Sequence, residues 1–260
     1  MPADRVDVLF VVDSSGSMKS CFNNLVQHLY KFLVPLERAH FASIRLGLLA
    51  YKSIKRYGDI GHQHTVLAGS DASFMRMLYA DSQPMGLVEK ETPFFTRNTE
   101  RFLECLRAIQ PSGNENSLLA LDTAADFPFE PASTTRRAVI WFSDERFHRG
   151  VTGNAPLEKA LDICRKYVKR KIMLYAFAPH SPTLEEHFGR LPRVCINNIV
   201  KAPEGSSVST WDMLDFSSVM ESIGQSISVS ALSPTMAREN YIPASYGQNN
   251  EATWNEHWYY

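Results

Sequence analysis

Oxygen-bearing side chains alternate near the start of the sequence, in the segment Asp13-Ser14-Ser15-Gly16-Ser17. Asp13 supplies a carboxylate, and Ser15 and Ser17 supply hydroxyls at the two following odd positions. Hard oxygen donors of this kind bind Mg²⁺, Mn²⁺ or Ca²⁺. Gly16 gives the chain freedom to turn sharply between the two serines. The motif therefore predicts a divalent-metal site with Asp13, Ser15 and Ser17 among its ligands.

The residues before Asp13 indicate where this loop lies. The run from Val6 to Val12 is mostly β-branched or aromatic and is too short for a helix. Such a run predicts a strand buried on both faces of a parallel sheet. Asp13 would then stand at the carboxyl end of the strand, where doubly wound α/β folds bind their ligands.

An Asp-x-Ser-x-Ser motif after a first apolar strand, followed by a long amphipathic helix, resembles the von Willebrand factor type A (VWA) domain. In that family three loops hold a metal at the metal-ion-dependent adhesion site (MIDAS). In the family, the third loop follows an apolar strand and has the sequence Thr-Asp-Gly. In this chain, the apolar segment from Ala138 to Phe142 is followed by Ser143-Asp144-Glu145. The resemblance implies Asp144 as a ligand, whereas Glu145 replaces the family's glycine.

The second loop of the family carries a Thr just before a helix, and the segment from Pro111 to Leu121 is similar. Aligning Ala120-Leu121 with the family's small-then-aliphatic pair places Glu115 where the Thr would be. A shift of one or two residues would instead make Asn114, Asn116 or Ser117 the ligand. If Glu115 binds the metal directly, three carboxylates lower the net positive charge of the site and favour a permanently held ion. If Glu115 instead contacts a water bound to the metal, one coordination position stays open for a partner.

Strand and helix patterns alternate along the rest of the chain, as in a three-layer α/β fold. The resemblance covers roughly residues 6 to 229 and implies a Rossmann-like α/β/α sandwich with a mostly parallel sheet and one short antiparallel edge strand at Val66-Leu67-Ala68. Helices are expected at 22–36, 73–79, 98–109, 118–125, 156–168 and 216–228, and Pro35 with the charged residues after it is expected to end the first of them. Further strands are expected at 44–51, 172–178 and 194–200. We expect one domain over residues 1–232 and a tail over 233–260 that ends in aromatic residues.

Composition excludes few functions. The formal net charge of −1 gives no basic footprint for nucleic acid or an anionic membrane, and we expect neither as a partner. No long uncharged apolar run is visible, and the first residues do not resemble a signal peptide, so we expect a cytoplasmic protein. The cysteines Cys21, Cys105, Cys164 and Cys195 are scattered without a Cys-x-x-Cys pair, so we expect buried free thiols.

The resemblance implies a Mg²⁺-dependent (or Mn²⁺- or Ca²⁺-dependent) protein-interaction module rather than an enzyme. An acidic side chain of the partner would complete the metal coordination, and the partner would be an ATPase, kinase or phosphatase of the same multiprotein system. One alternative is a scaffold with a degenerate or locked metal site that binds through its tail. A metal-dependent phosphohydrolase is disfavoured because Ser15 stands where haloacid dehalogenase-type phosphatases have their acidic proton donor.

Overall fold

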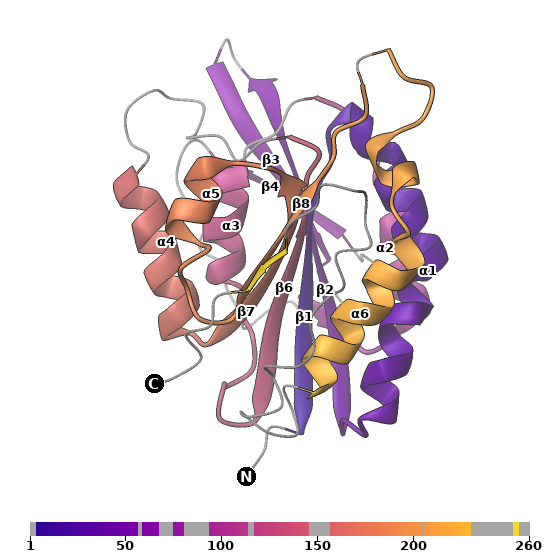
Figure 1. Ribbon diagram of the computed structural model, residues 1–260, viewed down its shortest axis with the longest axis vertical. Helices are drawn as coiled ribbons and strands as arrows, with labels where there is room; N and C mark the ends of the chain where they lie inside the picture. Colours follow the sequence, from indigo (N-terminus) through magenta and orange to yellow (C-terminus); the bar gives the residue numbers. More distant parts are fainter. Residues whose placement is uncertain are drawn as a thin grey trace.

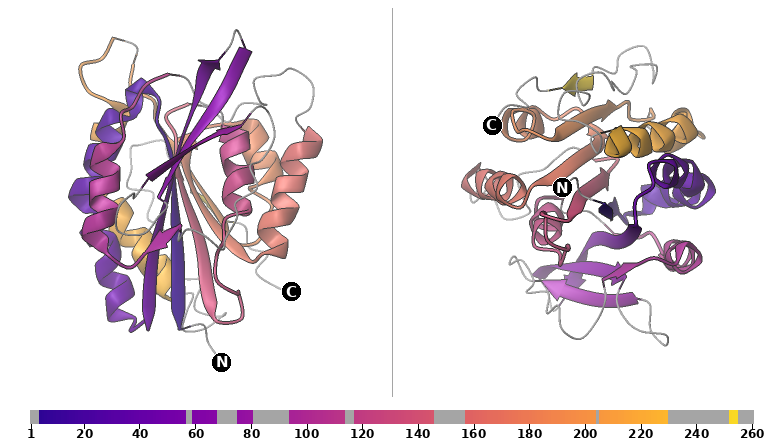
Figure 2. Two further views of the ribbon diagram at one scale, coloured as in Figure 1. Left: turned by 180° about the vertical axis from the view of Figure 1, so that it is seen from behind. Right: turned by 90° about the horizontal axis from the view of Figure 1, so that it is seen from below.

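In the computed structural model, a central sheet lies between two layers of helices (Figures 1 and 2). The structure describes residues 4–56, 59–67, 75–80, 94–113, 117–145, 157–203, 205–229 and 252–254. The strands are β1 (Arg5–Asp13), β2 (Ser43–Arg56), β3 (Asp59–Leu67), β4 (Met75–Ala80), β5 (Phe95–Thr96), β6 (Thr135–Phe142), β7 (Ile172–Pro179), β8 (Val194–Ile199) and β9 (Ala252–Trp254).

The strand order is β4-β3-β2-β1-β6-β7-β8-β9, and β5 also pairs with β2. The strands β2, β1, β6, β7 and β8 form a continuous parallel core. In contrast, β3, β4, β5 and β9 pair in antiparallel fashion with their neighbours. From β1 the chain proceeds first to β2 on one side and later to β6 on the other. The carboxyl end of β1 is therefore a topological switch point of the sheet.

The helices cover both faces of the sheet. One face carries α1 (Lys19–Arg38), α2 (Thr99–Ala108) and α6 (Phe216–Val229), and the other carries α3 (Ser117–Ala125), α4 (Leu157–Lys169) and α5 (Pro182–His187) (Figures 1 and 2). Two short 3₁₀ turns, η1 (Gly16–Met18) and η2 (Thr210–Met213), lie at the carboxyl end of the sheet. No helix within the described part of the chain combines the length and apolarity needed to cross a membrane.

The first strand shows why its sequence is apolar throughout. Val8, Phe10 and Val12 pack into the core beneath α1 and α6, while Leu9 and Val11 pack into the core on the opposite face. Both faces of β1 are thus buried, and an uninterrupted apolar run satisfies both. This burial fixes the position at which Asp13 leaves the sheet.

The predicted fold class is confirmed. The expected antiparallel strand is confirmed at Val66 and Leu67, but it is part of the longer strand β3, and β4 lies outside it. The helix predicted over 73–79 is wrong where the structure describes it, because residues 75–80 form β4. A seven-residue helix gains little by itself, whereas pairing with β3 satisfies the backbone of this segment.

The predicted end of the first helix is also wrong. Pro35 lies inside α1, which continues to Arg38. Proline removes one backbone donor, but its position in the last turn leaves only a short segment beyond it, and packing of Leu36 into the core holds that segment. Of the predicted tail over 233–260, the structure describes only β9, which pairs with β8.

Candidate metal centre

Asp13 occupies the switch point itself. It is the last residue of β1, it pairs in register with Tyr51 of β2, and its side chain is fully buried. The backbone amide of Ser15 donates to Asp13 Oδ1 at 2.7 Å, and the hydroxyl of Ser143 donates to Oδ2 at 3.1 Å. Because each carboxylate oxygen can accept more than one contact, these bonds orient Asp13 and leave lone pairs for a cation.

Ser15 and Ser17 lie beside this carboxylate. Ser15 is buried, Ser17 is exposed, and their hydroxyl oxygens are 3.2 Å apart. Both oxygens therefore belong to one cluster, one at its floor and one at its rim. The expected need for glycine at position 16 is not found: Gly16 lies outside the left-handed region, and a Cβ there would meet no atom within 4 Å.

Asp144 reaches the same cluster from the end of β6. Its side chain is only 4% exposed, and Oδ1 is buried without a hydrogen-bond partner among the described residues. Burial raises the pKa of Asp144 above its usual value, and a hydrogen bond from Ser17 opposes this rise. A buried carboxylate oxygen without a partner is costly, and a bound cation would offset that cost.

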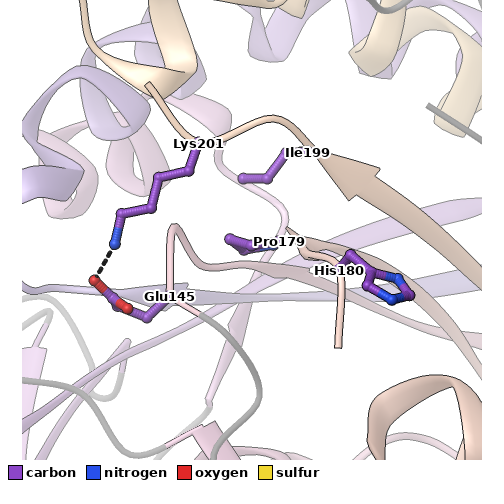
Figure 3. A pocket seen from close by; sticks show the side chains of 5 residues that line it. All are labelled: Glu145, Pro179, His180, Ile199 and Lys201. Atoms are coloured by element: carbon purple, nitrogen blue, oxygen red, sulfur yellow. Dashed lines mark hydrogen bonds and ion pairs between the residues drawn. The ribbon is translucent and has the colours of Figure 1, made fainter. Parts of the chain in front are cut away.

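Two charged neighbours act on Asp144. The carboxylate of Glu145 raises the pKa of Asp144 further, whereas the ammonium of Lys201, which follows β8, lowers it. Glu145 and Lys201 form an ion pair with each other. This pair borders a pocket of about 430 Å³ that Pro179, His180 and Ile199 also line (Figure 3).

The predicted second loop approaches the cluster, although Asn114, Glu115 and Asn116 lie outside the described residues. On its near side, the amide of Ser112 donates to the carbonyl of Ser14 at 2.7 Å. Gly113 then adopts a positive φ of 82°, a conformation that glycine tolerates without strain. On its far side, Ser117 is buried at the start of α3. Ser112, on the near side, is thus bonded to the first loop, and Ser117, on the far side, lies at the start of α3.

A hydrogen-bonded network beneath the cluster was not predicted. The indole Nε1 of Trp141 donates to the hydroxyl of Tyr51 at 2.8 Å, and that hydroxyl donates to Ser117 Oγ at 3.4 Å. Burial, and then the charge of Asp13, raise the pKa of Tyr51 well above its usual range. Trp141 and Ser143 lie at the end of β6, and Tyr51 lies within β2 opposite Asp13. These positions become informative only once the strand order is known.

A tryptophan in η2 also supports the first loop. Trp211 is fully buried, and its Nε1 lies 3.0 Å from the sulfur of Met18. Next to this contact, the hydroxyls of Ser20 and Ser209 are 2.5 Å apart. The segment between β8 and α6 thereby packs against the turn that presents Ser17.

The donor set suits a hard divalent cation. Two carboxylates and two hydroxyls provide only oxygen, which matches Mg²⁺, Mn²⁺ or Ca²⁺ better than a metal that prefers sulfur or imidazole. Among the residues that the structure describes, His, Cys, Asp and Glu side chains nowhere gather in threes around a possible metal position. Two carboxylates alone do not fill the coordination shell of such a cation, so the serine hydroxyls and water would have to supply further oxygens.

Comparison of the sequence with protein families and with curated proteins finds no match. Solved structures with a similar fold include human COPII-coat protein Sec24c, at 11% identity and a TM-score of 0.51, over 87% of this chain and 33% of that one. They also include the VWA domain of SpRpn10, at 10% identity and a TM-score of 0.47, over 82% and 93% of the two chains. The shared feature is the mostly parallel sheet with helices on both faces, which is the Rossmann-like α/β fold that the resemblance implied.

Another solved structure with some similarity is proximal thread matrix protein 1 from the mussel byssus, which has a zinc-occupied MIDAS motif. The identity is 14% and the TM-score 0.46, over 86% of this chain and 46% of the mussel protein. The chain thus spans less than half the length of the mussel protein and about a third of Sec24c. At these identities the likeness concerns the fold alone.

Proposed function

We propose that this VWA domain is a metal-dependent protein-interaction module rather than an enzyme. Asp13, Ser15, Ser17 and Asp144, together with Glu115 from the second loop, would hold Mg²⁺, or Mn²⁺ or Ca²⁺ in its place. When bound, the ion supplies a positively charged position that accepts one more anionic oxygen, such as a carboxylate of the partner protein.

One observation carries the proposal: Asp144 Oδ1 is buried without a partner beside the hydroxyl cluster of Ser15 and Ser17. A protein seldom retains such an oxygen unless an ion, a water or a ligand satisfies it. Asp13, held by Ser15 and Ser143, is already oriented for the same ligand. The exposure of Ser17 leaves the cluster accessible from the surface at this point, as binding of a partner requires.

We place the protein in the cytoplasm, within a multiprotein system that includes an ATPase, a kinase or a phosphatase. The proposal predicts capture of the same partner from a cell extract in Mg²⁺ by the wild type, and its loss in EDTA or with the variant Asp144→Asn. Asp126→Asn, which changes a carboxylate in the ion-pair cluster between α3 and α4, serves as the control. Capture that survives both EDTA and Asp144→Asn would contradict the proposal.

A scaffold that binds through its tail is the second candidate, and β9 is the observation that favours it. Residues 252–254 pair with β8, the outer strand of the parallel core, so this part of the tail lies against the sheet. Removing residues 233–260 separates the two functions. Loss of the partner with metal binding retained would favour the tail, whereas retained capture would favour the metal centre.

A further inference from the structure

The pocket beside Asp144 suggests what the partner must carry, a deduction that rests on the proposed function. Glu145, Pro179, His180, Ile199 and Lys201 line it, and its volume is about 430 Å³. Its residues come from the ends of β6, β7 and β8, at the same edge of the sheet as Asp13. Because Glu145 directly follows Asp144 in the chain, the pocket and the candidate metal centre are neighbours.

The pocket presents one cation that can exchange its partner. Lys201 pairs with Glu145, and their side chains are 52% and 33% exposed (Figure 3). An ion pair that is this exposed contributes little to stability because water screens it. Replacing Glu145 by another carboxylate at Lys201 therefore costs little.

His180 is less suited to this role. Its Nδ1 lies 3.0 Å from Glu185 Oε1, and the same oxygen accepts from Asn198 Nδ2 at 2.9 Å. The imidazole is thus already held by a carboxylate that a second side chain fixes in place. Lys201 remains the ammonium that faces the pocket from the side of Asp144.

The other walls are compatible with a methylene chain. Pro179 ends β7 and Ile199 ends β8, and Ile199 is buried. These two apolar side chains can cover the aliphatic part of a ligand while Lys201 binds its charged end. A glutamate combines such an aliphatic part with a carboxylate.

We infer that the pocket bordered by Lys201 and Glu145 binds a second acidic side chain of the partner, next to the one that completes the metal coordination. In an extended segment, side chains two residues apart point to the same side, roughly 6.6 Å apart. A partner segment with two acidic residues separated by one residue is therefore the simplest one to test. The first would bind at the metal, and the second would replace Glu145 at Lys201.

Two blocked peptides test this inference: acetyl-Gly-Asp-Gly-Glu-Gly-amide and its counterpart with Gln in place of Glu. Each is titrated into the full chain at saturating Mg²⁺, with dissociation constants measured by NMR. The Glu peptide should bind about threefold more tightly to the wild type, the range of one exposed ion pair. The preference should disappear in Lys201→Met and increase in Glu145→Gln, which removes the internal competitor.

Lys52→Met is the matched control, because Lys52 contacts Ser112 at the opposite side of the centre. Lys52→Met should weaken the binding of both peptides equally and leave the ratio of their dissociation constants unchanged. Equal binding of the two peptides to the wild type overturns the inference while leaving the proposed function intact. A Glu preference that persists in Lys201→Met also overturns it, and Mg²⁺-dependent binding of neither peptide contradicts both claims.

Discussion

Trp141 and Tyr51 are joined by a buried hydrogen bond of 2.8 Å, from the indole Nε1 to the phenolic oxygen, directly below the candidate metal centre. The bond connects β6 to β2 on either side of β1, and Tyr51 extends it to Ser117 at the start of α3. The phenol of Tyr51 thus contributes to the relative position of the first and second loops, alongside the backbone bond between Ser112 and Ser14.

Tyr51→Phe should destabilise the protein by about 1–3 kcal/mol, because it leaves the buried Trp141 Nε1 without its acceptor. It should also weaken Mg²⁺ binding, since Ser117 then loses its contact with Tyr51. Urea denaturation and calorimetry measure the two effects. Tyr175→Phe, which removes the 3.0 Å contact of Tyr175 with Ser226, is the control and should affect stability alone. Equal metal affinity in wild type and Tyr51→Phe would show that the network does not position the second loop.

Asp144→Asn should raise the stability of the metal-free protein by about 1 kcal/mol, or a few degrees in Tm, because it removes a poorly solvated charge. Burial raises the pKa of Asp144, and an acid whose native pKa lies above its unfolded value destabilises the folded state once it is ionised. This cost should appear as the pH rises above about 4 and be absent in the variant. Thermal unfolding in EDTA across pH 3–7 measures it, and a less stable variant at neutral pH would be the contrary result.

Mg²⁺ should make the wild type more stable than Asp144→Asn, the reverse of the order expected without metal. A ligand that binds only the folded state at a hundred times its Kd stabilises by about 2.7 kcal/mol. The wild type should gain this increment and Asp144→Asn should not. Equal gains in both proteins would mean that the ion binds elsewhere.

The four cysteines should resist thiol reagents in the folded chain. Cys21, Cys105, Cys164 and Cys195 are buried and free, as the sequence predicted. Burial raises the pKa of Cys105 to about 11 and of Cys164 and Cys195 to about 12, so the reactive thiolate is scarce at pH 8. Ellman's reagent should react with none of the thiols in the native protein and with all four after denaturation. Fast labelling of the native chain, or fewer thiols after unfolding, would contradict this.

Asp7 should be a stability residue with no role at the metal centre. It lies at the opposite end of β1, accepts two 2.7 Å bonds from Arg45, and accepts a third from the amide of Glu130 at 2.8 Å. Asp7→Asn should cost about 1–3 kcal/mol, because it weakens two charge-assisted hydrogen bonds to a buried acceptor, while Arg45 keeps its ion pair with Glu130. Chemical denaturation measures the loss, and an unchanged midpoint would contradict the assigned role.

The sequence was sufficient for the parts of the fold that rest on local pattern. The apolar runs before Asp13 and Asp144 identified β1 and β6 because both are buried on two faces. The strand β4 was missed because its backbone partners lie in β3, and pairing across the sheet cannot be read from a local window. The helix end at Pro35 was predicted wrongly because packing in the last turn outweighed the lost backbone donor.

The candidate site was predictable only in part, because some of its residues are brought together by strand pairing and not by closeness in the sequence. Asp13, Ser15 and Ser17 are neighbours in sequence, and Asp144 follows a recognisable strand. Ser143 and Lys201 follow the ends of β6 and β8, and Tyr51 lies within β2 opposite Asp13, so only the strand order brings the three residues together. Whether Glu115 or a neighbour is the second-loop ligand remains a prediction.

Calorimetric titration of Mg²⁺ into wild type, Asp13→Asn and Asp7→Asn, each shown to be folded by circular dichroism, tests the central claim most directly. The two variants remove one buried carboxylate charge from opposite ends of the same strand. The account predicts one bound ion per chain for the wild type and Asp7→Asn, and none for Asp13→Asn. Binding that survives in Asp13→Asn, or is absent from the wild type, would contradict it.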